Sequence, residues 1–301
     1  MKIKFIIPLL IIIQSCSSST TNEEHMNKTI EADTVGVQLN YLESFHNRKT
    51  VNDLDASLTE YILSNPNRPD SIHTTIYLLP FGNMKPEVEQ IISNEIDYLE
   101  TFFQMPVKIL PRITFDEVKQ NAQIKTRFVP DSDYGYYEKM KGGAENLREQ
   151  IEASSFMNKY MIDQKPEDAV AVLGITEHDI YNSSYNFLFG SSSTKNGVGL
   201  ISTFRLIDYG KQTKYNIRKV VSKQIVNLFS IRNVKDYECL LNFHNSKEEL
   251  ELGEFKLSPR ALEKFKYNIG FDYNKRFKEL EQIWLEEGNK SLSEYYQKCQ
   301  K

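Results

Sequence analysis

Residues that commonly bind metal ions are few in this sequence. Its five histidines are His25, His46, His73, His178 and His244. Two histidines four residues apart on a helix share one face and can take two tetrahedral positions of a Zn²⁺ ion. No two of these histidines have that spacing. A metal site rich in histidine would therefore have to be assembled from distant parts of the chain.

Two other groups of residues are candidates for a polar site. Asp179 and Arg205 are candidates to line a cleft, and the alternative is that they form structural caps or ion pairs. His178 precedes Asp179, which indicates either a polar site or a loop that faces solvent. Cys239 and His244 have the spacing C-x4-H, but without further ligands nearby this is only a weak metal pair.

The first residues have the pattern of an export signal. Lys2 and Lys4 precede the apolar run Phe5–Ile13, which is too short to span a bilayer. Ser15 and Cys16 follow, and a small residue before a cysteine at this place resembles a bacterial lipobox. Residues 1–15 are therefore predicted to be a lipoprotein signal peptide, with the lipid on Cys16. The alternative is an ordinary secretory signal that happens to contain a cysteine.

Lipidation would locate the protein in the bacterial cell envelope, anchored to a membrane. Two or more acyl chains anchor a protein stably, because each buried methylene contributes about 0.8 kcal/mol. Residues 16–70 are polar and are predicted to be a tether with one helix near Leu54–Leu63. Residues 71–301 are predicted to form the folded domain.

The composition supports a sizeable core and argues against one class of partner. Hydrophobic residues make up 40% of the 301 residues, and the formal net charge is −4. A surface that binds nucleic acid generally needs a basic excess, so nucleic acid is not expected as a partner. Arg218, Lys219 and Lys223 form a short basic segment that we interpret as a solvated face.

Patterns typical of strands and of helices alternate along the chain. Short β-branched and aromatic runs predict strands, and apolar positions at helical spacing predict helices. The predicted strands are Ile72–Phe81, Val107–Pro111, Ala169–Thr176, Tyr185–Gly190 and Val198–Leu206, and the predicted helices are Pro86–Phe103, 139–162, Tyr215–Ser230 and most of Pro259–Tyr296. Interleaved strands and helices favour an α/β or α+β fold with a mixed sheet.

Four segments resemble, in order and spacing, the archaemetzincins, a family of zinc metallopeptidases. They are Ile76–Gly82, Leu173–Tyr181, Asn186–Gly190 and Ser202–Leu206. A fifth, Cys239–Phe243, resembles the segment that carries the Met-turn, with Leu241 in place of the methionine. The resemblance implies a metzincin-like mixed sheet with long helices and a mostly helical C-terminal part.

The resemblance also implies a zinc motif that this sequence lacks. The family carries H-E-x-x-H-x-x-G-x-x-H, in which three histidines hold the zinc and the glutamate is the general base. The equivalent positions here are Lys223, Gln224, Asn227, Ser230 (for the glycine) and Asn233. A protonated lysine cannot ligate a cation, an amide is no general base, and asparagine is a poor zinc ligand.

A second zinc, held in the family by four cysteines, is missing its ligands as well. The equivalent positions are Val234, Cys239, Ser258 and Ala261, of which only Cys239 retains a thiol. One thiol does not make a structural zinc site. Zinc is therefore the cofactor that the family implies, and none is expected here.

Three functions are compatible with these observations. The preferred one is a non-catalytic pseudopeptidase on a lipid anchor, whose cleft binds a peptide, a glycan or another envelope protein. The alternative is an active zinc-dependent metallopeptidase with a rebuilt metal site, drawn from residues such as His178, His244, Asp179 or Glu238. The third is a structural envelope protein. The first requires an open cleft, the second a metal site, and the third a cleft filled by Phe, Tyr or Leu side chains.

Overall fold

A five-stranded mixed sheet forms the centre of the domain in the computed structural model, which describes residues 56–130, 147–207, 210–235 and 237–300. The strand order is β2-β1-β5-β8-β7, in which the first four strands run parallel and β7 runs antiparallel to β8. The bounds are Thr75–Phe81 (β1), Val107–Ile109 (β2), Ala169–Thr176 (β5), Gly190–Ser193 (β7) and Val198–Ser202 (β8). All these residues belong to one compact unit.

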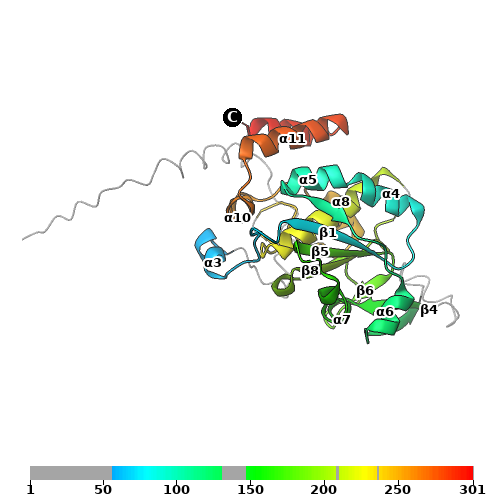
Figure 1. Cartoon of the computed structure of the whole chain (residues 1–301). Coiled ribbons are helices and arrows are strands. Elements are labelled where there is room, and N and C mark those ends of the chain that lie inside the picture. Colours follow the sequence, from blue (N-terminus) through cyan, green and yellow to red (C-terminus); the bar gives the residue numbers. More distant parts are fainter. Residues whose placement is uncertain (1–55, 131–146, 208–209, 236, 301) are drawn as a thin grey trace, which may run out of the picture. The chain divides into compact units, whose positions relative to one another are not determined.

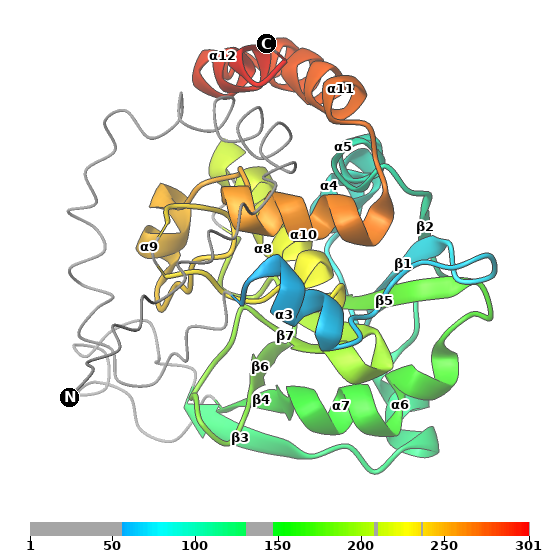
Figure 2. The same cartoon turned by 90° about the vertical axis from the view of Figure 1, so that its left-hand side faces the viewer.

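Helices cover both faces of this sheet (Figures 1 and 2). Ile76 and Leu78 of β1 face one side, where α4 (Pro86–Asn94), α5 (Ile96–Phe103) and α8 (Lys211–Leu228) pack. The alternate residues of β1 face α6 (Phe115–Asn121) and α7 (Ala153–Lys159) on the other side. Strands buried on both faces read as continuous apolar runs, which is why β1 and β5 were recognisable. The predicted helix Pro86–Phe103 is broken in two at Glu95.

A smaller three-stranded sheet lies on the side of α6 (Phe115–Asn121) and α7 (Ala153–Lys159). Its strands, in the order β3-β4-β6, are Thr126–Pro130 (β3), Leu147–Glu152 (β4) and Asp179–Tyr181 (β6). The predicted helix over 139–162 is therefore wrong for residues 147–152, while residues 139–146 lie outside the described residues. Pairing with β3 and β6 overrides the local preference there.

The predicted strand at Tyr185–Gly190 is also wrong. Only Leu188 makes a single bridge, to Ile180, and the strand β7 begins where Gly190 pairs with Ile201. Two short 3-10 helices, Met161–Gln164 and Thr194–Asn196, complete the elements around the sheets.

The C-terminal part is helical, as predicted. Its helices are Lys247–Leu252 (α9), Pro259–Ile269 (α10), Tyr273–Glu286 (α11) and Lys290–Lys298 (α12). The predicted α/β fold class with a mixed sheet, long helices and a mostly helical C-terminal part is thus confirmed.

The last part of the predicted tether packs on the domain. Helix α3 (Leu58–Leu63) carries Tyr61, which is 3% exposed and whose hydroxyl donates to the backbone oxygen of Phe229 at 2.6 Å. Asn67 donates from its side chain to the backbone oxygens of Val170 and Leu228. From Ser57 onward the chain therefore belongs to the packed body.

No helix in the described part of the chain is both long and apolar enough to cross a membrane. The predicted signal peptide and Cys16 lie outside the described residues, so export and lipidation stay predictions.

Removing one hydroxyl tests the docking of α3. Tyr61→Phe leaves the Phe229 carbonyl and the Asn268 amide without the Tyr61 partner that each contacts at 2.6 Å. We expect the free energy of unfolding, measured in urea, to fall by about 1–2 kcal/mol. Leu63→Ala, on the same helix but 79% exposed, is the control and should change it by less than about 0.5 kcal/mol. Equal effects of the two changes would contradict the docking.

Candidate binding cleft

An open cavity of about 750 Å³ lies against α8 and the edge strand β7. Its walls come from the loop before β7, from β7 with the turn after it, from one face of α8, and from the segments that follow α8. The lining residues include 184–195, Val220, Lys223, Gln224, Asn227, Arg232, Asn233, Phe243, His244, Asn245 and Leu250.

The four positions equivalent to the three zinc ligands and the general base all line this cavity. Lys223, Gln224 and Asn227 lie on one face of α8, and Asn233 follows the helix. Ser230, at the position predicted for the turn glycine, has φ = +66°. That left-handed conformation favours glycine, so the backbone makes the turn that the resemblance implies even though the side chain has changed.

Aromatic side chains border the cavity without filling it. Tyr185, Phe187, Phe189 and Phe243 are in its walls, and the open volume remains beside them. A structural protein with a filled cleft is therefore not what this cavity supports.

Lys223 brings a weakly solvated amine to the cavity. Its ammonium donates to the backbone oxygen of Asn242 and lies 5.8 Å from the centre of the Phe243 ring. Burial in these surroundings disfavours the charged form and lowers the pKa of Lys223 to about 8. The amine is therefore divided between charged and neutral forms just above neutral pH.

Gln224 joins α8 to the edge strand. Ser192 donates through Oγ to Gln224 Oε1 at 2.5 Å, and Gln224 is 7% exposed. A Cβ placed on Gly190 would lie 2.8 Å from Gln224 Cγ, so only glycine lets β7 approach the helix this closely. The residue at the general-base position therefore packs against the wall.

The amides of Asn227 and Asn233 have unused hydrogen-bonding capacity. The Oδ1 atom of each is buried and has no hydrogen-bond partner within the described structure. Buried acceptors without a donor are costly. Both atoms are closed to solvent, so a molecule in the cavity would contact them only after the side chains move.

Asp179 and Arg205 are brought together, but neither lines the cavity. Asp179 is 1% exposed, and Arg205 Nη2 lies 2.8 Å from its Oδ2 while Arg148 Nη2 lies 3.0 Å from the same atom. Gln150 Nε2 also donates to Asp179 Oδ2, at 2.6 Å. The prediction that Asp179 and Arg205 are cleft residues is thus wrong, and the alternative of an ion pair is what the structure has.

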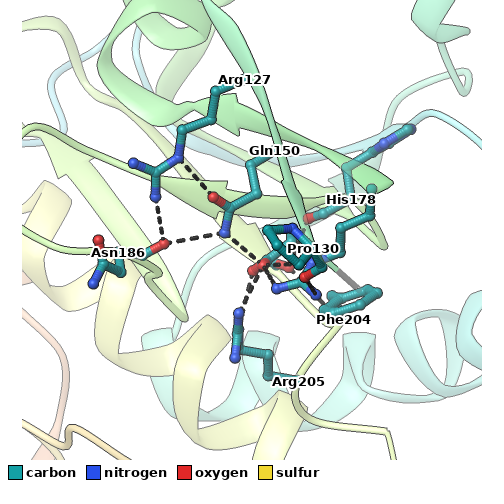
Figure 3. A network of polar contacts seen from close by, with 10 residues as sticks. Arg127, Pro130, Gln150, His178, Asn186, Phe204 and Arg205 are labelled. Carbon is teal, nitrogen blue, oxygen red and sulfur yellow. Dashed lines mark hydrogen bonds and ion pairs between the residues drawn. The ribbon is translucent and has the colours of Figure 1, made fainter. Parts of the chain in front are cut away.

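This network nevertheless positions one wall of the cavity. Gln150 and Arg127 both donate to the backbone oxygen of Asn186, at 3.0 and 2.8 Å, as Figure 3 shows. The Arg205 guanidinium lies 4.1 Å from the centre of the Phe187 ring. Asn186 and Phe187 line the cavity, so the network around the buried Asp179 carboxylate stabilises the loop that forms this wall.

The residues suggested for a rebuilt metal site do not gather. Within the described residues, no group of three or more His, Cys, Asp or Glu side chains is close enough to hold a metal ion. His244 lines the cavity, whereas the ring of His178 lies 4.7 Å from that of Phe115 and 5.8 Å from that of Phe81. Burial lowers the pKa of His178. Residues that fit zinc are thus not found at the cavity.

The four positions of the second zinc site are buried. Val234, Cys239 and Ala261 belong to one apolar cluster, and Ser258 caps α10 by accepting from the Ala261 amide. Cys239 is fully buried and forms no disulfide with the other described cysteine, Cys299. Apolar packing therefore occupies the place where the resemblance implies a structural metal.

Two cavity residues were missed in the sequence. Lys195 follows β7 and Arg232 follows the turn at Ser230, and both are exposed. Nothing in their spacing indicates a site, because only the fold brings them to the cavity that Lys223 lines.

The predicted solvated face at Arg218, Lys219 and Lys223 is wrong at two of these residues. Arg218 and Lys219 are only 1% and 3% exposed.

Comparisons with known proteins confirm the resemblance to archaemetzincins. The chain is 25% identical over 205 residues to an archaemetzincin of Pyrococcus furiosus, which covers 66% of this chain and 95% of that protein. It is 29% identical over 171 residues to human archaemetzincin-2, covering 46% of this chain and 47% of that one. The chain thus spans about half of the human relative. No family model matches the chain.

A solved structure is similar as well. The crystal structure of archaemetzincin from Methanopyrus kandleri aligns with a TM-score of 0.49 and 18% identity, over 67% of this chain and 99% of that chain. On the sequence matches, the chain is archaemetzincin-like over about two thirds of its length.

Neutralising the buried carboxylate tests the support of the cavity wall. Asp179→Asn leaves Arg148 and Arg205 side by side without their shared counter-charge. We expect the free energy of unfolding to fall by about 3–5 kcal/mol. Asp163→Asn, at an exposed position, is the matched control and should stay within about 0.5 kcal/mol. A loss no greater than the control's would mean that the network does not stabilise the domain.

The reactivity of Lys223 tests its electrostatic surroundings. Because only the neutral amine reacts, modification by a small amine-reactive ester should rise from pH 6.5 and level off above pH 9, which peptide mapping by mass spectrometry can follow. Lys219 has a similarly lowered pKa of about 8 but is closed off by the Leu250 and Glu251 carbonyls, so it should react far more slowly. Reactivity of Lys223 that keeps rising through the ordinary lysine pKa of about 10.4 would disprove the desolvation.

Proposed function

We propose that this protein is a non-catalytic, archaemetzincin-like pseudopeptidase whose open cleft binds a peptide segment. One observation carries the proposal. The cavity of about 750 Å³ is retained, and the positions expected to hold a catalytic zinc and its general base are Lys223, Gln224, Asn227 and Asn233.

The chemistry of these side chains argues against peptide hydrolysis. Zinc-assisted hydrolysis needs a ligand set that fixes the metal and a base beside the bound water. The ammonium of Lys223 repels a dication, and the amide of Gln224 is engaged with Ser192. A likeness in fold does not carry an activity over when the residues of the site are different.

The edge strand supports a peptide as the ligand. Among the described strands, β7 pairs with β8 alone, and its residues line the cavity. An unpaired strand edge is a template for an extended chain, which gains main-chain hydrogen bonds while adjacent pockets take alternate side chains. A peptide segment of another envelope protein therefore suits this cleft better than a compact small molecule.

The proposal includes a lipid anchor at Cys16 on a membrane of the bacterial cell envelope. It is supported by the apolar run Phe5–Ile13, which ends shortly before this cysteine. The anchor would keep the cleft at a membrane surface, where partners are other envelope proteins rather than nucleic acid.

Metal content is the direct test. We expect the full-length chain, purified in detergent, incubated with zinc and then dialysed, to retain near-zero zinc by elemental mass spectrometry and to show no peptidase activity. The control is a variant that carries Lys223→His, Gln224→Glu, Asn227→His, Ser230→Gly and Asn233→His. Because positions 223, 227 and 233 line one cavity, the three restored imidazoles should hold one zinc per chain.

The two measurements separate the possible failures. One tightly held zinc per unmodified chain, with peptide hydrolysis, would overturn the proposal in favour of an active enzyme with a rebuilt site. A restored variant that takes up no zinc would mean that the cleft does not have the geometry that the resemblance implies.

A further inference from the structure

The charges in the cavity wall have one sign. The described lining includes Lys195, Lys223, Arg232 and the titratable His244, and it contains no aspartate or glutamate. The whole chain, in contrast, has 41 acidic residues and 37 lysines and arginines. A cavity lined by cations, in a protein of net negative charge, has a positive electrostatic potential where a ligand would lie.

The three cations reach the cavity from different elements. Lys195 lies in the short 3-10 helix after β7, Lys223 on α8, and Arg232 in the segment after α8. No ion pair of Lys195 or Arg232 occurs within the described parts of the chain, although ion pairs are common elsewhere on this surface. Neither charge is therefore paired with a carboxylate of the described residues.

We propose that the cleft selects peptide segments that carry a carboxylate, held by Lys195, Lys223 and Arg232. This inference rests on the proposed binding function and specifies the chemistry of the ligand. The guanidinium of Arg232 offers paired donors that match a carboxylate, and Lys223 adds a charge that solvent screens less than on the open surface.

The edge strand favours a peptide over a simple anion. Lys195, Lys223 and Arg232 line the same cavity as β7, which pairs with β8 alone among the described strands. A peptide can meet both features, because its carboxylate contacts the cations and its backbone N–H and C=O groups pair with the strand edge. Cations and a strand edge in one cavity thus point to an acidic peptide segment.

Three synthetic probes test this inference on the full-length chain in detergent. The first is a short alanine peptide with two glutamates, N-acetylated and C-terminally amidated. The second replaces both glutamates by glutamine, and the third is the glutamine peptide with a free C-terminal carboxylate. By calorimetry the glutamate peptide should bind about tenfold more tightly than the amidated glutamine peptide. The third probe shows whether a terminal carboxylate can serve instead of a side chain.

Matched variants connect the preference to the cleft. Lys195→Gln combined with Arg232→Gln should remove most of the tenfold difference. Lys278→Gln combined with Lys298→Gln removes the same charge from exposed positions on α11 and α12 and should leave the difference in place. Salt should weaken the preference, because the screening length falls to about 3 Å at 1 M.

Each other outcome is decisive. Equal binding of the glutamate and glutamine peptides would overturn the carboxylate preference and leave the binding function intact. Binding of neither would overturn both. Displacement of the glutamate peptide by inorganic phosphate at equal concentration would show a simple anion site and overturn the peptide inference. An equal loss of the tenfold preference in the cleft variant and in the surface control would overturn it as well.

Discussion

The burial of α8 between the sheet and the C-terminal helices is the constraint on which the cleft depends. Arg218, 1% exposed, donates to both Glu95 and Glu287 and lies 4.9 Å from the centre of the Trp284 ring. A charge buried in this way stabilises one arrangement of its partners, because leaving it unpaired is costly. The start of α5, helix α8 and the end of α11 are therefore held in one fixed arrangement. The face of α8 that borders the cavity is fixed by contacts on the opposite side of the helix.

The same constraint leaves the walls of the cavity to be held by contacts of the protein itself. A metal ion commonly contributes to the folding free energy of the site that binds it. Here two hydrogen bonds join α8 to β7 and the turn after it. Ser192 Oγ donates to Gln224 Oε1, and the Thr194 hydroxyl donates to the Asn227 backbone oxygen at 3.2 Å. At the positions of the second zinc, Val234, Cys239 and Ala261 pack in the core. Packing and hydrogen bonds among the described residues thus hold the cavity walls in place.

Features that rest on local pattern were predictable from the sequence, and features that rest on long-range pairing were not. Strand β5 was predicted with its observed bounds because a strand buried on both faces is a continuous apolar run. Strand β4 was read as a helix because Leu147–Glu152 is mostly polar and acquires its conformation from two neighbouring strands. The turn at Ser230 was predictable only through the resemblance, since serine itself does not indicate a positive φ. The cationic lining of the cleft was not predictable, because Lys195 and Arg232 come from separate segments that only the fold brings together.

The docking of the N-terminal segment has a mechanical consequence. At the end of α8, the Tyr61 hydroxyl donates to the Phe229 backbone oxygen and the Asn67 side chain donates to the Leu228 backbone oxygen. The backbone N–H of Asn67 donates to Ser230 Oγ at 3.0 Å. If the chain before Ser57 is held at a membrane, a force that pulls the domain away from the membrane acts on these hydrogen bonds. The same force acts on the turn at Ser230, which leads from α8 to the cavity residues Arg232 and Asn233. Tension along the anchor and occupancy of the cleft would therefore act on the same few residues.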